Sequence, residues 1–355
     1  MSTQGRNIQI VGGEPFYPPK LLFSTKKNDI KQYFKSKFAD KNVTYTYGGY
    51  YSIKKIIRDI EFEEKEHVLL PSYMCPTILK PFQECHIRYY FFKIHKNLSI
   101  DTEDLLSKIN NNTKAVFFIH YFGFNVSKKE KIVLQGLRDK GIILIQDLVQ
   151  DFFVSPHFII GDFAFNSFRK FFPVEGSCII SNKELEIIDT SFNTRYFFNK
   201  LSGRYYRYKH YKKGISESVF LDRFSRAEKY YYKKGICGFN RFDEFLINRF
   251  EINKLSAIRK NNYSMLLEEF SSIAIIKEIK DCVPLAFPIV VENRDIIIKK
   301  MKEHNVFCPI HWRLSDEIDK NEYSDSWWLS DHILSIPIDA EINYMPVVNY
   351  LKSIL

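Results

Sequence analysis

The sequence predicts an α/β protein built around a mostly parallel sheet that is flanked by helices. From residue 44 onward, short apolar runs of strand length alternate with segments of helical periodicity. This alternation is typical of parallel sheets, because neighbouring parallel strands are joined by helix-length crossovers. At 355 residues, the chain is long enough to bury a large core and to form two domains.

The expected elements follow in chain order. Isoleucines recur at helical spacing from Ile53 to Ile60 and predict a helix that begins near Gly48-Gly49. Strand candidates come next at residues 67–70, 87–93, 115–120, 141–146, 159–165 and 177–181. The remainder predicts a long helix and a smaller α+β unit, with a helix at about 242–270, a strand at 285–291, a helix at about 294–304 and a strand at 333–338.

Composition and cysteine spacing restrict the class of protein. Hydrophobic residues make up 45% of the chain and charged residues 26%, which is typical of a soluble globular protein. No apolar stretch approaches the roughly 20 residues that span a bilayer, and the N-terminus lacks the apolar core of a signal peptide. The six cysteines are scattered without a C-x-x-C pair. We therefore expect a cytoplasmic protein with reduced thiols and without a metal site.

The net charge of +10 is concentrated in residues 200–234. This basic connector holds 11 Lys or Arg against three acidic residues, together with seven tyrosines and two phenylalanines. A basic, aromatic patch can hold phosphates and stack on a base or a sugar, and Arg204 and Arg207 are candidates for such contacts. The alternative is a solvated, partly helical excursion whose aromatic side chains pack on the body. Nucleic acid is a poor third interpretation, because no nucleic-acid-binding motif accompanies the charge.

Four polar residues at the ends of two buried strands carry the most chemical information. Asp147 and Gln150 follow one apolar run, and Ser167 and Lys170 follow the next. A carboxylate, a hydroxyl and an amine at neighbouring strand ends are the groups that pyridoxal 5′-phosphate (PLP) needs. The carboxylate keeps the pyridine nitrogen protonated, the amine reacts with the aldehyde, and the hydroxyl helps to hold the phosphate. Taken alone, these residues also fit ordinary polar strand ends.

Several short motifs in the same order resemble the DegT/StrS-type (DegT/DnrJ/StrS) aminotransferases, which are PLP enzymes that aminate keto-sugars attached to nucleotides. The resemblance covers residues 40–200 well and the C-terminal third more loosely. Residues 47–53 stand at the position of the family's Ser-Gly-Thr phosphate turn, and residues 68–73 resemble its V-(I/L)-x-P-(S/A)-Y strand exit. The remaining matches are residues 100–105, 112–116, 119–123 and 334–338.

The resemblance implies the aspartate-aminotransferase fold, PLP-dependent transferase fold type I. That fold has a large domain with a mostly parallel seven-stranded sheet, a small C-terminal α+β domain, and a homodimer with active sites at its interface. We place the large PLP-binding domain, with its basic connector, at residues 1–235 and the small domain at 236–355.

The same resemblance assigns roles to individual residues. Lys170 is the catalytic lysine, although it lies three residues after Ser167 rather than the more common five. Asp147 pairs with the pyridinium nitrogen, and Asp151 is the neighbour that would replace it after a shift in register. Gln150 contacts the region of the ring's 3-oxygen, and Ser167 hydrogen-bonds to the phosphate.

Further cofactor and substrate contacts depart from the family pattern. Gly49 and Tyr50 offer backbone N–H groups to the phosphate at a helix N-terminus, but Tyr50 replaces the usual Thr. Cys75 stands where relatives carry an aromatic residue on the PLP ring, so Tyr73 or another aromatic residue is expected to stack there. The remaining candidates are Asn240, expected at the partner subunit's phosphate, and His311 and Trp312, in a loop expected near the substrate. His120 is expected to be a packed strand-end histidine.

Three functions are compatible with these residues. The first is an aminotransferase that moves nitrogen from an amino acid, expected to be L-glutamate, to a keto-sugar nucleotide in bacterial surface polysaccharide (O-antigen) or amino-sugar biosynthesis. The second is a PLP-dependent sugar dehydratase, but relatives with that activity carry His in place of Lys170. The third is a non-catalytic member of the fold that acts as a binding subunit. Its support is the list of departures from the family pattern: Tyr50 for Thr, Cys75 for an aromatic residue, Ser177 where a Gly is usual, and the altered lysine spacing.

Overall fold

The computed structural model describes residues 9–15, 28–186, 193–232 and 235–355. Its centre is a seven-stranded sheet with the strand order β2-β8-β7-β6-β5-β3-β4, in which only β8 runs antiparallel to its neighbours. The strands are β2 (Asn42–Thr46), β3 (His67–Pro71), β4 (Arg88–Phe92), β5 (Thr113–Ile119), β6 (Ile143–Leu148), β7 (Phe163–Asn166) and β8 (Ser177–Ser181). The predicted fold class, a mostly parallel seven-stranded α/β sheet, is confirmed.

The sequence forms these strands because both faces of the sheet are covered. Every residue of β3 is buried, as are the apolar residues of β5 and β8. The helices around this sheet are α1 (Ile30–Lys37), α2 (Gly49–Ile60), α3 (Leu79–Glu84), α4 (Thr102–Lys108) and α5 (Lys128–Asp139). The four isoleucines whose spacing predicts α2 are all buried, and α2 packs against β7 and β8.

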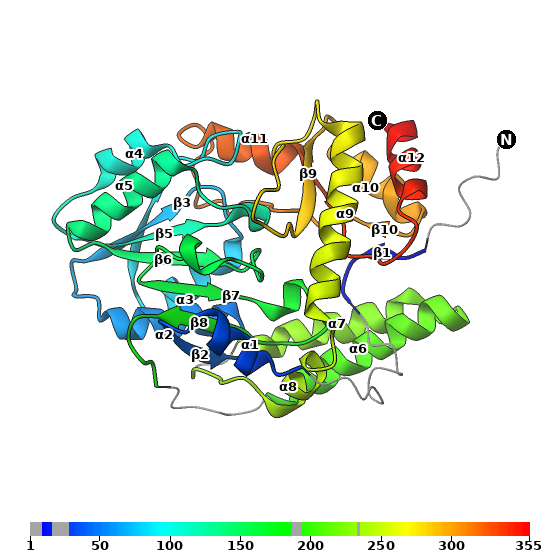
Figure 1. Cartoon of the computed structure of the whole chain (residues 1–355), viewed down its shortest axis with the longest axis horizontal. Helices are drawn as coiled ribbons and strands as arrows, with labels where there is room; N and C mark the ends of the chain where they lie inside the picture. Colours follow the sequence, from blue (N-terminus) through cyan, green and yellow to red (C-terminus); the bar gives the residue numbers. More distant parts are fainter. Residues whose placement is uncertain (1–8, 16–27, 187–192, 233–234) are drawn as a thin grey trace.

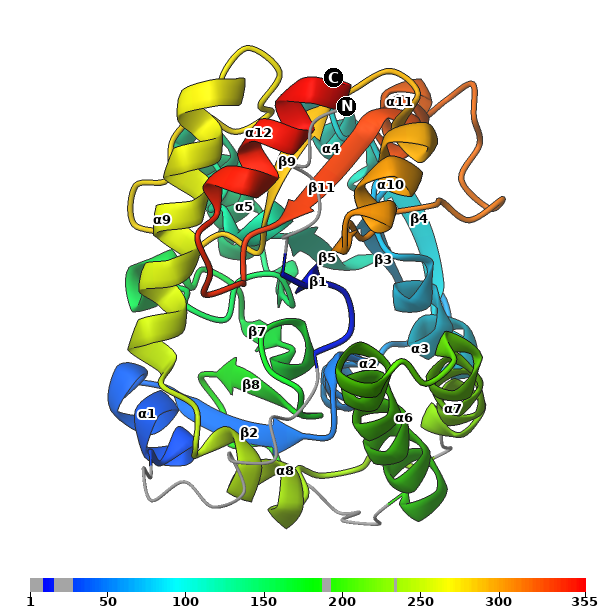
Figure 2. The ribbon, with the colours of Figure 1, turned by 90° about the vertical axis from the view of Figure 1, so that its right-hand side faces the viewer.

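A second group of elements lies to the right of the large sheet in Figure 1. Strand β9 (Ala286–Val290) pairs antiparallel with β11 (Ile333–Pro337), and α9 (Ile252–Phe270), α10 (Arg294–Glu303) and α12 (Met345–Ile354) surround this pair. Strand β1 (Val11–Gly12) pairs in parallel with β10 (Val306–Phe307), so a segment near the N-terminus joins the C-terminal elements (Figure 2). The division at residue 235 stays a prediction.

The single long helix expected at about 242–270 is wrong. The chain forms α8 (Arg241–Ile247) and α9 instead, with a break between them. At this break, Asn248 accepts hydrogen bonds through its backbone oxygen from Asn28 N at 2.6 Å and through its side chain from Ile30 N at 2.9 Å. These bonds to a distant segment hold the start of α1, and no local sequence pattern announces them.

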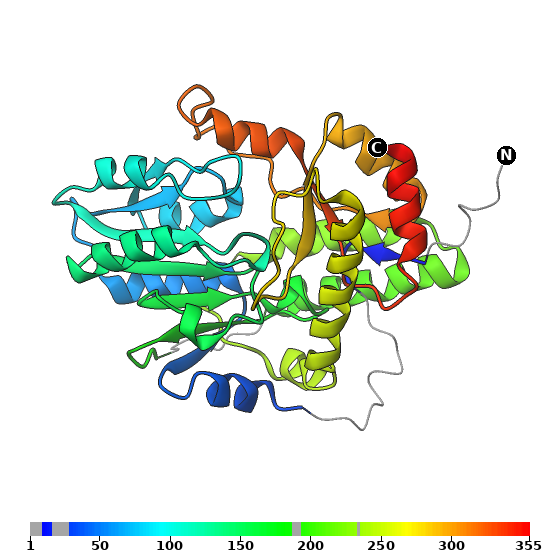
Figure 3. The same ribbon diagram turned by 45° about the horizontal axis from the view of Figure 1, so that its top comes forward.

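The basic connector forms two helices that pack against each other, α6 (Thr194–Lys213) and α7 (Glu217–Tyr231). The helices approach closely at Gly203, where a Cβ would collide with the ring of Phe224. The α6–α7 hairpin extends along β1 toward the C-terminal elements (Figure 3). Arg207 Nη2 donates to Gly12 O at 3.1 Å, and Lys302 pairs with Glu217 at 3.4 Å.

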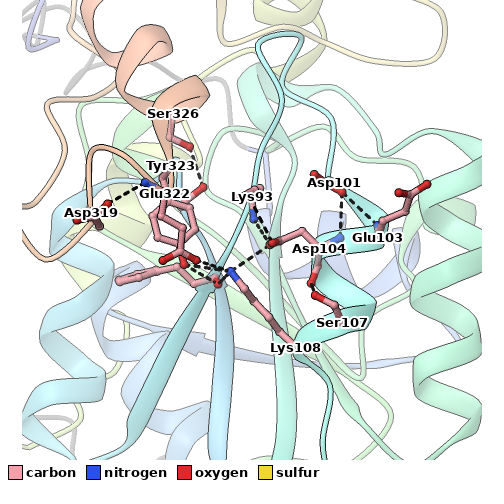
Figure 4. Close-up of polar contacts among 12 residues, drawn as sticks. Lys93, Asp101, Glu103, Asp104, Ser107, Lys108, Asp319, Glu322, Tyr323 and Ser326 are labelled. Atoms are coloured by element: carbon pink, nitrogen blue, oxygen red, sulfur yellow. Dashed lines mark hydrogen bonds and ion pairs between the residues drawn. The ribbon is translucent and has the colours of Figure 1, made fainter.

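Lys108 at the end of α4 joins the large sheet to the segment that precedes α11 (Ser324–His332), as Figure 4 shows. Its Nζ lies 3.0 Å from Glu322 Oε1, 3.1 Å from the Tyr323 hydroxyl and 2.8 Å from Phe91 O. Tyr323 and Trp312 both belong to the apolar core of the large sheet. The segment from Trp312 to α11 is therefore fixed against the sheet. Within the described residues, no helix combines the length and apolarity of a membrane span.

Candidate functional site

A cavity lies at the carboxyl ends of the central parallel strands. Ile119 ends β5, Asp147 lies near the end of β6, Phe165 lies in β7, and all three line this cavity together with Gly49 at the start of α2. The strand register places Asp147 directly between Ile119 and Phe165. Ligands in α/β sheets bind in such crevices at the carboxyl ends of strands. We call this space the first cavity.

Asp147 is a buried carboxylate that faces the first cavity. Its side chain is 4% exposed, and its Oδ1 accepts a hydrogen bond from Val149 N at 2.7 Å. Burial raises the pKa of Asp147 to about 7, against the opposing effects of the Val149 bond and the charge of Lys170. A cation beside this carboxylate would stabilise its charged form, and a protonated pyridine nitrogen is such a cation.

Asp151 is held elsewhere, although a shift in register would exchange the two carboxylates. Its Oδ2 lies 2.9 Å from His120 Nδ1, and His120 Nε2 lies 2.8 Å from the amide nitrogen of Gln146. His120 is fully buried in this network. Of the two carboxylates, Asp147 lines the first cavity and Asp151 does not.

Gln150 presents an unsatisfied donor in the same cavity. Its Oε1 accepts from Phe122 N at 2.7 Å, which fixes the orientation of the amide. Its Nε2 is buried and has no hydrogen-bond partner among the residues that the structure describes. A buried donor without an acceptor is unfavourable by about 1–3 kcal/mol. A ligand oxygen, such as the 3-oxygen of PLP, would satisfy it, so this residue fits the predicted cofactor.

Ser167 and Lys170 lie on the turn that follows β7, where Phe168–Lys170 form a 3-10 helix. Both line the first cavity. Burial lowers the pKa of Lys170, and the neighbouring charge of Arg169 adds to this effect, whereas Cys75 and Asp147 oppose it. A lysine with a lowered pKa is more often neutral and therefore nucleophilic, as a reaction with an aldehyde requires.

The start of α2 provides a place for an anion next to Ser167. Gly48 is the N-cap of α2 and Gly49 is its first residue, so they belong to the end of the helix where backbone N–H groups have no intrahelical acceptor. A Cβ on Gly49 would lie 3.3 Å from Val149 Cγ2, and one on Gly48 would collide with the hydroxyl of Tyr231. The glycines therefore allow close packing around this end of the cavity.

Tyr50 lines the first cavity, but its hydroxyl is used on the side of α3. It donates to Glu84 and accepts from Lys54 Nζ, which lies 3.3 Å away. Tyr50 therefore does not supply the hydroxyl contact that the family's Thr would make to phosphate. Its backbone N–H remains a candidate at the start of α2.

The aromatic residues around the first cavity come from distant segments. Trp312 lines it, as do Tyr231 and Tyr232 at the end of α7, which residue-level sequence reasoning missed. The sequence indicated these two tyrosines only through the high density of tyrosines in the basic connector, which does not single out individual positions. Cys75 lines the cavity with its Sγ 3.0 Å from Thr77 Oγ1. Tyr73 is fully buried and donates to His311 O, and it is not among the lining residues.

Three predicted contact residues are used elsewhere in the fold. Asn240 is the N-cap of α8, accepting from Phe242 N and Asp243 N at 2.9 Å each, and its amide donates to Asp243. Arg204 and Arg207, predicted as phosphate contacts, are 2% and 3% exposed and line neither the first cavity nor the cavity that adjoins it. Arg207 Nη2 donates to a backbone oxygen of β1, and its Nη1 is buried without a partner among the described residues. Their role in substrate binding stays a prediction.

Arg204 belongs to a buried ion-pair cluster that joins the hairpin to the N-terminal segment. Its Nη2 lies 3.0 Å from Glu14 and 3.1 Å from Glu175, and Lys200 lies 3.3 Å from Glu14. Burial alone would raise the pKa of Glu14. The positive charges of Lys200, Arg204 and Arg169 outweigh this effect and lower the pKa to about 2. The cations of this cluster are therefore already neutralised by carboxylates of the same chain.

Comparisons with solved structures establish the class of fold. Spr1654 from Streptococcus pneumoniae, in its PLP form, superposes with a TM-score of 0.69 at 13% identity, over 96% of this chain and 92% of that chain. The aminotransferase TlmJ from Streptoalloteichus hindustanus gives 0.69 at 11% identity, over 97% and 98%. A DegT DnrJ EryC1 StrS aminotransferase from Brucella abortus gives 0.66 at 12% identity, over 96% and 92%.

At these identities the likeness is one of fold, and it extends over nearly the whole chain. The resemblance expected from the sequence motifs is thus confirmed at the level of the fold, which is that of the DegT/DnrJ/EryC1/StrS aminotransferases. No protein-family model and no curated protein sequence matches the chain.

Proposed function

We propose that this protein is a PLP-dependent aminotransferase that transfers an amino group from an amino acid to a keto-sugar nucleotide. The observation that carries the proposal is the convergence of Lys170, the buried carboxylate of Asp147 and the unpaired amide of Gln150 in one cavity. Proteins of the same fold include structures with PLP and with pyridoxamine phosphate bound. The sugar substrate rests on the motif resemblance to the DegT/StrS type.

The residues of the first cavity would divide the work as follows. PLP, when bound, supplies a protonated ring that accepts electrons from the amino acid's Cα. Asp147 would hold the proton on the ring nitrogen, and Gln150 Nε2 would donate to an oxygen on the ring. Ser167 and the first N–H groups of α2 would hold the phosphate. Lys170 Nζ would face the aldehyde end of the cofactor and would serve as the base that moves the proton of the donor's Cα.

We further propose L-glutamate as the donor, a role in bacterial surface polysaccharide or amino-sugar biosynthesis, a homodimer and a cytoplasmic location. Lys170 disfavours the dehydratase alternative, because relatives with that activity carry His in place of this lysine. Lys170 lines the first cavity. The non-catalytic alternative would retain the fold without using Lys170. Its support is the replacement of the usual Thr by Tyr50, whose hydroxyl is bound to Glu84 and Lys54.

The test is reconstitution of the purified protein with PLP. The expected result is a visible absorbance band that borohydride abolishes, with the reduced cofactor recovered by mass spectrometry on the peptide that contains Lys170. In a separate, unreduced sample, L-glutamate should bleach the band and a keto-sugar nucleotide should restore it. PLP attached to a different lysine, or a band that no amino acid bleaches, would contradict the proposal.

A further inference from the structure

A second cavity of about 420 Å³ adjoins the first and shares Lys170 and Arg169 with it. Its far side is formed by C-terminal elements: Arg259 from α9, Ala286 at the start of β9, and Asp339 just after β11. Figure 2 shows α9, β9 and β11 grouped above β7, which precedes Lys170. Lys170 thus stands between two cavities, one of which is the cofactor site proposed above.

Arg259 is the most unusual group in the second cavity. Its side chain is 2% exposed, and its Nη1 donates to Leu285 O at 2.6 Å and to Pro284 O at 3.3 Å. Its Nε is buried and lacks a hydrogen-bond partner in the described part of the chain. The guanidinium carbon lies 4.8 Å from the centroid of the Phe171 ring, and Phe171 directly follows Lys170. Two carbonyls hold this cation in place without neutralising it.

Among the described residues, no other charged side chain of the second cavity forms an ion pair with Arg259, although the charge of Asp339 partly offsets the lowering of the Arg259 pKa by burial. Glu14 and Glu228 both pair with Lys200, each at 3.3 Å. Asp339 lies on the same cavity wall but forms no ion pair with Arg259, and its Oδ1 is itself buried without a hydrogen-bond partner among the described residues. His311, which also lines the cavity, is held by Ser335 Oγ at 3.0 Å, and burial keeps its pKa well below the usual range. A buried cation without a directly paired anion is unfavourable, so the site is suited to an anionic ligand.

We propose that the second cavity is the amino-donor site and that Arg259 binds a carboxylate of the donor amino acid. This inference rests on the proposed aminotransferase function. A guanidinium presents a planar fork of donors that matches a carboxylate. Lys170, at the junction of the two cavities, lies where the donor's amine must arrive. A sugar diphosphate is the less suitable occupant, because the nearby cations Lys200 and Arg204 are already paired with Glu14.

The test is the half-reaction of the PLP-loaded protein with L-glutamate and with L-alanine. The loss of visible absorbance measures its progress. Arg259→Gln should raise the apparent dissociation constant of L-glutamate roughly 10- to 100-fold, the range expected for a charge-assisted hydrogen bond. Arg259→Lys keeps the charge and should raise this dissociation constant less. It replaces the Gln variant in the test if that variant does not fold. Weaker binding of both amino acids would assign Arg259 to the α-carboxylate, and weaker binding of L-glutamate alone would assign it to the side-chain carboxylate. Either result supports the proposal.

Asp339→Asn gives an effect of opposite sign. Removing this carboxylate from the same cavity wall should lower the dissociation constant of L-glutamate, whereas a merely structural role for the two residues would predict weaker binding in both variants. Lys254→Gln is the matched control, because Lys254 also belongs to α9 but pairs with Glu341 at 2.6 Å on the exposed side. Binding of glutarate to the cofactor-free protein, measured by calorimetry, provides a readout that does not depend on catalysis.

The possible failures can be told apart. If the wild-type protein binds PLP but reacts with no amino acid, the proposed function itself is wrong. If the wild type reacts and Arg259→Gln retains its dissociation constant for L-glutamate, the donor site is wrong while the function stands. A variant that instead loses affinity only for the sugar nucleotide would also overturn the inference, because the second cavity would then hold the other substrate.

Discussion

Asp147→Asn should stabilise the cofactor-free protein at alkaline pH, because the native carboxylate is buried and forms no ion pair with the described residues. Its pKa rises from an ordinary value of 3.8 to about 7. An acid whose pKa is higher in the folded than in the unfolded protein holds its proton more tightly when folded. The folded protein therefore loses stability as the pH rises from about 4 to about 7. The neutral Asn side chain avoids this loss and can keep the bond from Val149 N.

The magnitude follows from the same pKa. A change from 3.8 to about 7 corresponds to about 4 kcal/mol at pH 8, an upper bound that assumes the Asn amide fits as well as the protonated acid. Chemical denaturation of the cofactor-free proteins at pH 5 and pH 8 measures this difference. The stability advantage of Asp147→Asn should be roughly 2.5-fold larger at pH 8 than at pH 5. Asp139→Asn, at the exposed end of α5, is the control and should show no such dependence.

Adding PLP should reverse the order of stability. The protonated ring nitrogen would pair with the Asp147 carboxylate and not with an amide, so PLP should stabilise the wild type more than the variant. The variant should still bind PLP but lose most of its turnover, because a neutral amide cannot hold the ring proton. A variant whose advantage is the same at both pH values, or that keeps the wild-type turnover number, would refute the reasoning.

Four further outcomes are expected. Lys170→Ala should abolish the visible absorbance and transamination, while circular dichroism shows an intact fold. Full activity of this variant would exclude Lys170 as the catalytic lysine. Gly48→Ala should weaken PLP binding in an absorbance titration, and adding Tyr231→Phe should restore part of it, because the new Cβ collides with the Tyr231 hydroxyl; unchanged binding in the single variant would contradict this contact. Arg204→Gln should lower the unfolding free energy by roughly 3–5 kcal/mol and Lys209→Gln by much less, because Arg204 is buried and pairs with the buried carboxylate of Glu175; equal losses would contradict this reasoning. Sedimentation should show a homodimer, and a fully active monomer at assay concentration would refute that prediction.

The sheet could be predicted because its strands are covered on both faces. Parallel strands such as β5 and β6 read as nearly continuous apolar runs, which the sequence displays directly. Strand β2 is different, since Asn42 to Tyr45 are only partly buried and give no such run. Asp147 and Lys170 could be predicted for the same reason, because they lie where such apolar runs end.

The contributions of distant segments could not be predicted from local patterns. Tyr231 reaches the first cavity because α6 and α7 fold back on each other, and Trp312 does so because Lys108 and Tyr323 fix its segment to the sheet. Arg259 occurs within an ordinary helical sequence and carries no motif. Only the packing of α9 against residues 284–285 shows that its guanidinium is buried.

Charge alone did not distinguish structural cations from ligand-binding ones. The basic connector has most of the excess positive charge in the sequence, yet Lys200 and Arg204 are paired with carboxylates of Glu14, Glu175 and Glu228. Arg259 lies in a region with no charge excess, and no ion pair accompanies it in the described structure. Because a buried cation requires a counter-charge, the pairing of each cation is more informative than its position in a basic stretch. By that criterion, Lys200 and Arg204 hold the fold together. Arg207 has no paired carboxylate within the described chain either, but it lines neither cavity, whereas Arg259 lies beside Lys170 and is the cation that we propose binds the donor.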